Sequence, residues 1–239
     1  MNNEYFVMKT LNKIVLGTLS LCTLLCTSCD SFLNQDVPQA TLSEDQVNDP
    51  LYIDNICISA YAIFISAEDI NSSFSMWNFD VRSDDAYKGG ISENDGDVFH
   101  QLEVSQGILT TNWNINDMWV RLYNCLSRVN AAIAALDAMD DSYELKEQRL
   151  GEMKFLRAYG HFLLKRLYKN IPFVMDPLMK QADYNELSNT KYTNDEGWQL
   201  IADDLEYAYS VLPTTQADKG RPTQASAAAL LAKVYLYKA

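Results

Sequence analysis

Apolar side chains recur every three or four residues through most of this chain, which is the spacing of helices that pack one face against a core. Four such stretches are residues 119–136, 143–168, 193–212 and 220–237. A fifth, residues 51–64, follows Pro50, a residue suited to the first turn of a helix. No strand-rich segment is visible, although a short hairpin within residues 77–104 stays open. The spacing therefore predicts a mostly all-α fold.

Helix-end signals divide these stretches into separate helices. Thr193 and Glu196 stand at the spacing of a capping box, in which each side chain bonds the backbone N–H of the other residue. Pro172 and Pro213 follow the second and third stretches and end them. The four helices after Trp119 are therefore expected to pair as two antiparallel hairpins.

Small and aromatic residues alternate on these helices. Small residues allow two helix backbones to approach closely, and large rings on the facing helix fill the remaining gaps. The small ones are Ala158, Gly160, Ala228, Ala229 and Ala232, and the aromatic ones are Tyr159, Phe162, Tyr235 and Tyr237. This pattern is typical of tetratricopeptide-like helical hairpins, although the formal repeat consensus is not met.

The first residues are interpreted as a targeting signal. Lys9 and Lys13 precede an apolar run, residues 14–26, that is too short to span a membrane. Residues 1–28 are therefore assigned as a lipoprotein signal peptide, with Cys29 as the lipidated first residue of the mature chain. An ordinary secretory signal with Cys29 as a bystander is the alternative, and translation can start at Met1 or Met8. Residues 29–42 are expected to be a tether before a helical domain over residues 43–239.

Residues 67–116 lose the helical spacing and carry several aromatic residues among turn signals. Sugars are recognised by flat apolar rings beside amide and carboxylate groups. This long irregular loop region therefore supplies the candidate ligand-binding residues Trp77, Asn78, Asp84, Tyr87 and Trp113, with Asp85 and Asn112 beside them. The alternative is that the rings anchor the loop onto the helices.

Charge and composition exclude several other classes of function. The formal net charge is −13, so a nucleic-acid partner is not expected. With only two histidines, neither a metal site nor histidine-centred catalysis is expected, and no cofactor is predicted. Residues 93–97 miss the spacing of a calcium loop.

Several other polar groups and both core thiols are given structural interpretations. Arg157 is interpreted as the partner of an acidic residue on a neighbouring helix, Asp203 and Asp204 as solvated, and His161 as a capped or surface imidazole. Cys57 and Cys125 lie in helical patterns, so buried free thiols are favoured over a disulfide.

Four sequence blocks together resemble the SusD/RagB family of nutrient-binding outer-membrane lipoproteins of Bacteroidetes. They are the lipidated start with Cys29 to Leu33, the helix with Trp119 to Asn130, the run Arg157 to Phe162 followed by Pro172, and the run Gly220 to Tyr237. Lys169 departs from the family, which usually has Gly after this Tyr. The chain is thereby identified as a SusD-like N-terminal domain. Its end in mid-helix at Ala239 leads us to expect a C-terminal truncation.

The resemblance implies a cell-surface protein, lipid-anchored in the outer membrane, that captures oligosaccharides. It implies delivery to a SusC-like TonB-dependent porin, which the tetratricopeptide-like helices face, whereas loops on the other side bind the ligand. It also implies that the chain is not an enzyme. Two rivals stay open: a protein-binding tetratricopeptide scaffold lipoprotein without sugar binding and, less favoured, a surface glycoside hydrolase.

Overall fold

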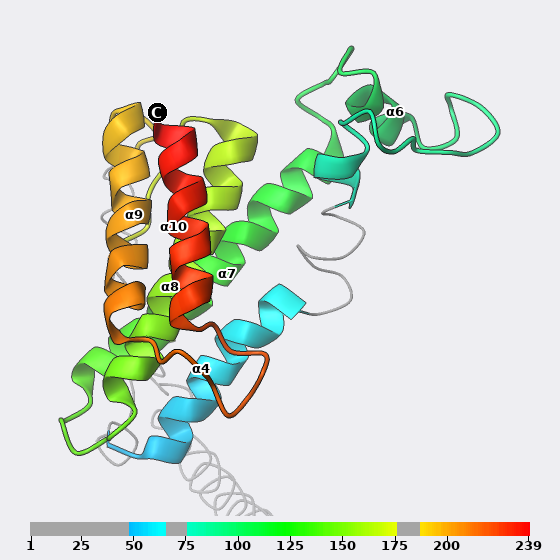
Figure 1. Ribbon diagram of the computed structural model, residues 1–239. Helices are drawn as coiled ribbons and strands as arrows, with labels where there is room; N and C mark the ends of the chain where they lie inside the picture. The colour runs from blue at the N-terminus through cyan, green and yellow to red at the C-terminus, as the bar shows by residue number, and fades with distance from the viewer. Residues whose placement is uncertain (1–47, 66–75, 176–186) are drawn as a thin grey trace, which may run out of the picture. The chain divides into compact units, whose positions relative to one another are not determined.

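A computed structural model describes residues 48–65, 76–175 and 187–239, and these parts are entirely helical apart from turns and extended connections. The elements are α4 (Pro50–Ile65), η1 (Met76–Asp80), α6 (Asp97–Glu103), α7 (Trp113–Ala138), α8 (Lys146–Tyr168), α9 (Asn194–Val211) and α10 (Gln224–Lys238) (Figure 1). The prediction of an all-α fold is confirmed. The predicted signal peptide, Cys29 and the tether lie outside the described residues.

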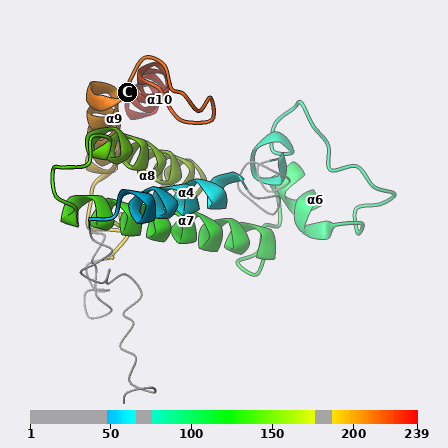
Figure 2. The same cartoon turned by 90° about the horizontal axis from the view of Figure 1, so that it is seen from below.

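Helices α7 to α10 pack in sequence order, and each runs antiparallel to the one before it (Figure 1). Helix α4 lies along α7 and touches α8 (Figure 2). The predicted tetratricopeptide-like hairpins are therefore present. The largest fully buried side chains come from all of the longer helices except α10, and they include Ile53, Leu122, Leu126, Phe162 and Ile201. Within the described residues, no helix combines the length and apolarity needed to cross a membrane.

The helix starts follow their sequence signals. The Thr193 side chain accepts the N–H of Glu196 at 3.3 Å, and the Glu196 carboxylate accepts the N–H of Thr193 at 2.7 Å, which confirms the predicted capping box. Thr223 and Ser226 form the same reciprocal pair at the start of α10. After α8, Lys169 adopts a φ of 63°, in the left-handed region that favours glycine.

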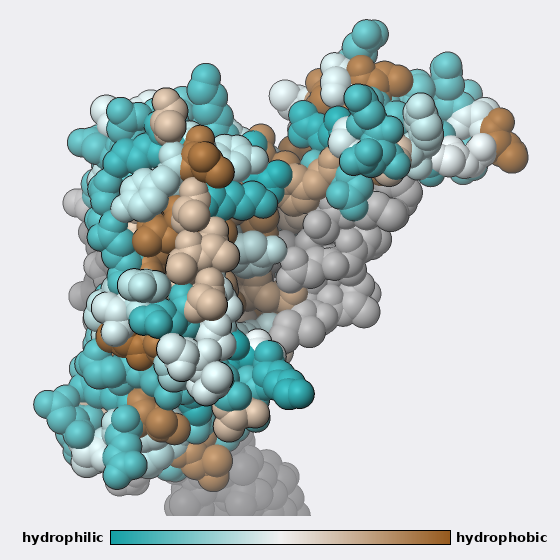
Figure 3. Space-filling view, viewed as in Figure 1, coloured by the Kyte–Doolittle hydropathy of each residue, from teal (hydrophilic) through white to brown (hydrophobic). Residues whose placement is uncertain are grey.

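Close helix packing depends on glycine in α8 and much less on alanine in α10. A Cβ built on Gly160 would lie 3.0 Å from Leu126 Cδ2, and one on Gly151 would lie 2.5 Å from Val211 Cγ2. The prediction for α10 was partly wrong, because Ala229 and Ala232 are exposed. The face of α10 turned to the viewer in Figure 3 carries brown and tan side chains.

A buried ion pair fastens α8 to α9. Arg157 donates from Nε and Nη2 to the two carboxylate oxygens of Asp204, at 2.7 and 2.8 Å. Its Nη1 donates to the Asn130 side chain and to the Met175 carbonyl. Arg157 therefore pairs with a neighbouring helix, as predicted. The solvated interpretation of Asp204 was wrong, because this residue is only 5% exposed.

The segment after α8 runs against the bundle and is held by buried side chains. Asn130 donates to the Val174 carbonyl at 2.9 Å, and the Tyr123 hydroxyl donates to the Pro172 carbonyl at 2.7 Å. The Val174 N–H donates to His161 Nε2 at 3.3 Å. The surface interpretation of His161 was wrong, because its imidazole is 1% exposed and stacks on Phe173.

His161 makes the stability of the fold depend on pH. Burial, together with the charge of Arg157, lowers the pKa of His161 from 6.5 to about 3. As pH falls from 6.5 towards 3, the unfolded chain binds a proton that the folded chain does not, so stability falls, by at most about 1.4 kcal/mol per pH unit. We expect chemical denaturation to show a shallower loss for His161→Gln, which keeps an acceptor for Val174.

Curves for His161→Gln that stay parallel to those of the unaltered chain between pH 6.5 and 4 would contradict the assignment.

A second buried acid, Glu152, joins three parts of the fold. Its carboxylate accepts hydrogen bonds from Tyr61 on α4 at 2.9 Å, from Arg149 on α8 at 2.9 Å and from Arg221 before α10 at 2.7 Å. Glu152 has no exposed surface. The connection between α9 and α10 is therefore bonded to the core through one carboxylate.

Cys57 and Cys125 are buried free thiols, as predicted. Burial raises the pKa of the Cys57 thiol to about 12, with smaller contributions from the nearby carboxylates of Asp54 and Glu152. At neutral pH Cys57 is therefore protonated and packs as a small apolar side chain.

Candidate functional site

The candidate site lies in residues 76–113, where η1, α6 and the first turn of α7 contact one another through α6. The structure corrects the predicted loop in two places. Residues 97–103 form α6, and α7 begins at Trp113, six residues before the predicted start. The possible hairpin is not present, because no strand occurs among the described residues of this stretch.

Asn112 explains why α7 starts early. Its Oδ1 accepts the N–H of Ile115 at 3.4 Å, so Asn112 caps the helix. Its Nδ2 donates to the Val98 carbonyl at 3.0 Å and to the Gln101 side chain at 3.1 Å, both in α6. The amide of Asn112 therefore joins α6 to α7 and has a structural role.

Lys88 closes the loop between η1 and α6. Its ammonium donates to the carbonyl oxygens of Gly89, Ser92 and Asp95 at 3.0, 2.9 and 2.9 Å. The Asp95 carboxylate also accepts the N–H of Ile91 at 3.2 Å. A single cationic side chain thus gathers three backbone carbonyls and fixes the loop that follows Tyr87.

The candidate residues differ in exposure. Tyr87 is 81% exposed and Asp84 is also at the surface. Trp113 is 49% exposed and meets the Phe99 ring edge-on, with the ring centroids 5.6 Å apart. Asn78 is only 3% exposed, so its amide is not presented to solvent. Trp77 belongs to η1, but its side chain lies outside what the structure describes.

These positions divide the candidate residues into two groups. The exposed rings of Tyr87 and Trp113 can stack on the C–H face of a sugar ring, and the Asp84 carboxylate can accept hydrogen bonds from sugar hydroxyls. Phe99 packs edge-on against Trp113 and so helps to hold that ring in place. Asn78 lies below the surface and is suited to holding η1 in place.

A second group of cationic and aromatic residues was not predicted as a site from the sequence, where Phe162 and Tyr237 were assigned packing roles only. Arg166 on α8 lies 4.6 Å from the centroid of Phe79, 5.4 Å from that of Phe162 and 5.6 Å from that of Tyr237. Lys233 on α10 lies 5.8 Å from the centroid of Phe162. The spacing of four between Phe162 and Arg166, and between Lys233 and Tyr237, was the available signal, since such residues share a helix face.

Metal binding has little support among the residues that the structure describes. They contain no group of three or more His, Cys, Asp or Glu side chains placed to hold an ion. Residues 93–97 were not expected to form a calcium loop, and the Lys88 ammonium supplies a positive charge to this loop.

Comparisons with known proteins identify relatives over most of the chain. A SusD-like family model, described as starch-binding and associating with the outer membrane, matches residues 31–236. A SusD-like protein of Formosa agariphila is 30% identical over 125 residues, which cover 52% of this chain and 24% of that protein. A second SusD-like protein of that organism is 24% identical over 222 residues, which cover 88% of this chain and 40% of its own length.

Solved structures show the same architecture. Surface glycan-binding protein A from Bacteroides fluxus is 29% identical with a TM-score of 0.64, and the match covers 80% of this chain and 40% of that one. A laminarin-binding SusD-like protein is 25% identical with a TM-score of 0.64, covering 80% and 41%. The chain thus spans less than half the length of these relatives. Because the family model covers nearly all of the helical region, this chain belongs to the SusD-like (SusD/RagB) family.

Proposed function

We propose that this chain is part of a non-catalytic surface lipoprotein that binds oligosaccharides and delivers them to a SusC-like TonB-dependent porin. The observation that carries the proposal is that the Tyr87 and Trp113 rings and the Asp84 side chain are each exposed, in a family described as starch-binding. Rings of this kind bury large apolar areas with little loss of side-chain freedom, so they suit the flat faces of sugars.

The relatives support the choice of ligand class. Two matched structures are named as a surface glycan-binding protein and a laminarin-binding protein. The family description also places its members at the outer membrane. Lipidation of Cys29 would provide the attachment in this chain, because several acyl chains anchor a protein stably. The tetratricopeptide-like helices would then face the porin with the surfaces that lie away from η1.

The adjacent acids Asp203 and Asp204 are not placed as the catalytic pair of a glycosidase, which agrees with a role in binding. A glycosidase needs two carboxylates facing one bond, about 5–9 Å apart. Asp204 is committed to Arg157 inside the bundle, whereas Asp203 is exposed and accepts a hydrogen bond from Gln199 at 2.7 Å. This pair therefore lacks the geometry to cleave a glycosidic bond.

Removing either exposed ring tests the proposal. In the full chain, Tyr87→Ala and Trp113→Ala are each expected to weaken binding of a glycan found on an array by about 1–3 kcal/mol, because stacking area is lost. Isothermal titration calorimetry measures the affinity, and a thermal melt measures stability. The melting temperature should change little for Tyr87→Ala, since that side chain is 81% exposed.

Tyr209→Ala is the matched control, because Tyr209 is 46% exposed on α9, outside the candidate site. It should leave glycan affinity unchanged. Equal affinities for all three variants would contradict the assigned surface, and an array without any bound glycan would favour the protein-binding scaffold. Release of reducing sugar by repurified protein would favour the hydrolase.

A further inference from the structure

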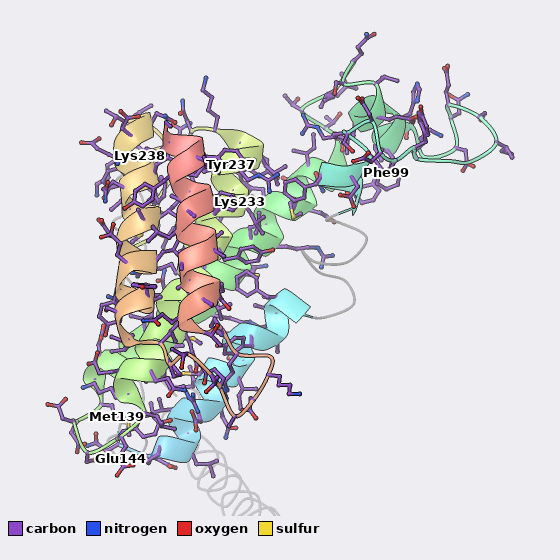
Figure 4. The ribbon with its side chains drawn as sticks, in the orientation of Figure 1. Phe99, Met139, Glu144, Lys233, Tyr237 and Lys238 are labelled. Carbon is purple, nitrogen blue, oxygen red and sulfur yellow. The ribbon has the colours of Figure 1, made fainter. Side chains whose placement is uncertain are left out.

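Two cationic side chains converge on one group of rings at the ends of α8 and α10. We define the cationic corner as Arg166, Lys233, Phe79, Phe162 and Tyr237. Arg166 lies within 6 Å of three ring centroids, and Lys233 shares the Phe162 ring with it. Lys233 and Tyr237 both stand on the last turns of α10 (Figure 4).

Neither cation has an acidic partner or a hydrogen-bond acceptor among the residues that the structure describes. This differs from the other arginines of the core, since Arg149 pairs with Asp54, Arg157 with Asp204 and Arg221 with Asp218. The chain has 32 acidic and 19 basic residues, so partners are abundant in its composition. A guanidinium carries five N–H donors, and the rings satisfy its charge but not its directed hydrogen bonds.

The cationic corner is open to solvent. Lys233 is exposed, Arg166 is half-buried and Tyr237 is 45% exposed. Two neighbouring cations are already engaged, because Lys238 donates to the Gln199 side chain and Lys165 lies over the Trp198 ring with Asp195 nearby. Among the described residues at this corner, Arg166 and Lys233 are therefore the cations that no side chain engages apart from the rings, with the Tyr237 ring beside them.

The corner borders the segment assigned to glycan binding. Phe79 belongs to η1, as do Trp77 and Asn78, and its ring is the closest of the three to Arg166. A sugar at the candidate site that extends past η1 would thus meet a positive charge and an exposed ring together. A guanidinium matches the two oxygens of a carboxylate or a sulfate, and Lys233 adds a second positive charge.

We propose that the cationic corner makes this protein select anionic saccharides, by binding a carboxylate or sulfate group through Arg166 and Lys233 while Tyr237 stacks on the sugar ring. This inference rests on the proposed function and specifies its substrate class. The overall charge of −13 does not attract an anionic glycan over long distances, so such binding depends on local positive charges like those of the corner. Binding should weaken as salt rises, because such charges are screened over about 8 Å at physiological ionic strength.

The test uses the full chain and chemically matched sugars. Galacturonate hexasaccharide supplies carboxylates, its methyl-esterified form removes their charge, and a sulfated galactan oligosaccharide supplies sulfate. The variants are Arg166→Met and Lys233→Met, which keep an unbranched apolar stem against the rings. Lys154→Met is the matched control, because Lys154 also lies over a ring, 3.7 Å from the Tyr207 centroid, but outside the corner.

Calorimetry should show that an acidic sugar binds at least about tenfold more tightly than its uncharged counterpart, with affinity falling as sodium chloride rises. Arg166→Met and Lys233→Met should each lose about tenfold in that affinity, whereas Lys154→Met should lose none. Whichever of the uronate and the sulfated sugar binds more tightly identifies the preferred anion.

Two different results would overturn the inference, and they are distinguishable. If neutral sugars bind as tightly as acidic ones or more tightly, and Arg166→Met does not change these affinities, anion selection is contradicted. The proposed binding of glycans is then unaffected. No binding of any saccharide, charged or neutral, would contradict the proposed function itself. Thermal melts of each variant separate a lost contact from a lost fold.

Discussion

Replacing Asp204 by alanine is expected to lower the free energy of unfolding by about 3–5 kcal/mol. This is the largest effect on stability that we expect from a single substitution. Arg157 is 6% exposed, and its two strongest hydrogen bonds, at 2.7 and 2.8 Å, go to this carboxylate. Without Asp204, a buried cation would keep only the Asn130 amide and the Met175 carbonyl. Urea denaturation followed by circular dichroism measures the loss.

The neighbouring acid supplies the control. Asp203→Ala changes the same residue type on the same helix, but Asp203 is exposed, so its effect should stay within about 0.5 kcal/mol. The double variant Arg157→Met with Asp204→Leu should regain most of the stability, because it removes both charges and fills the space. A double variant no more stable than Asp204→Ala would show that the pair holds α8 and α9 by more than charge balance.

Glu152→Ala is the second large loss, expected at about 3–4 kcal/mol, since Glu152 accepts hydrogen bonds from Tyr61, Arg149 and Arg221 with no exposed surface of its own. Arg149 keeps Asp54 and Arg221 keeps Asp218, which limits the loss. Limited proteolysis should also cut the connection between α9 and α10 sooner, because Arg221 lies in it.

Glu147→Ala is matched to this change. Glu147 is on the same helix and also accepts a hydrogen bond from a tyrosine, Tyr207, at 2.6 Å, but it is exposed. Its loss should cost less than about 1 kcal/mol. If both glutamates cost the same, burial of the Glu152 carboxylate would not be the source of its effect.

The long helices were predictable because each repeats its apolar spacing over several turns and carries a marked end. Thr193 and Glu196 define the start of α9 in one four-residue signal. Helix α6 is seven residues long, too short to establish a period, and it begins after Gly96 at a φ of 78°. The early start of α7 rests on the Asn112 cap of the Ile115 N–H, and the same amide is held by Val98 and Gln101, 14 and 11 residues away, so the helical spacing alone did not reveal it.

The candidate site was predictable in residue type but not in exposure. The sequence nominated both Tyr87 and Asn78 from the same loop, yet one is 81% and the other 3% exposed. Burial depends on which surfaces meet in three dimensions, and neighbouring residues of one loop can differ completely. Asp204 illustrates the same limit, because its partner Arg157 lies on another helix. The cationic corner likewise joins η1, α8 and α10, which no single stretch contains.

The Lys88 ammonium affects the conditions under which the Tyr87 ring stays exposed for binding. Many extracellular loops depend on a divalent ion to draw their carbonyl oxygens together. Here the Lys88 ammonium binds three carbonyl oxygens at 2.9–3.0 Å, so a side chain of the protein takes the place of the ion. The loop should therefore keep its shape when chelators strip the medium of calcium and magnesium, so that the ring remains displayed in ion-poor surroundings.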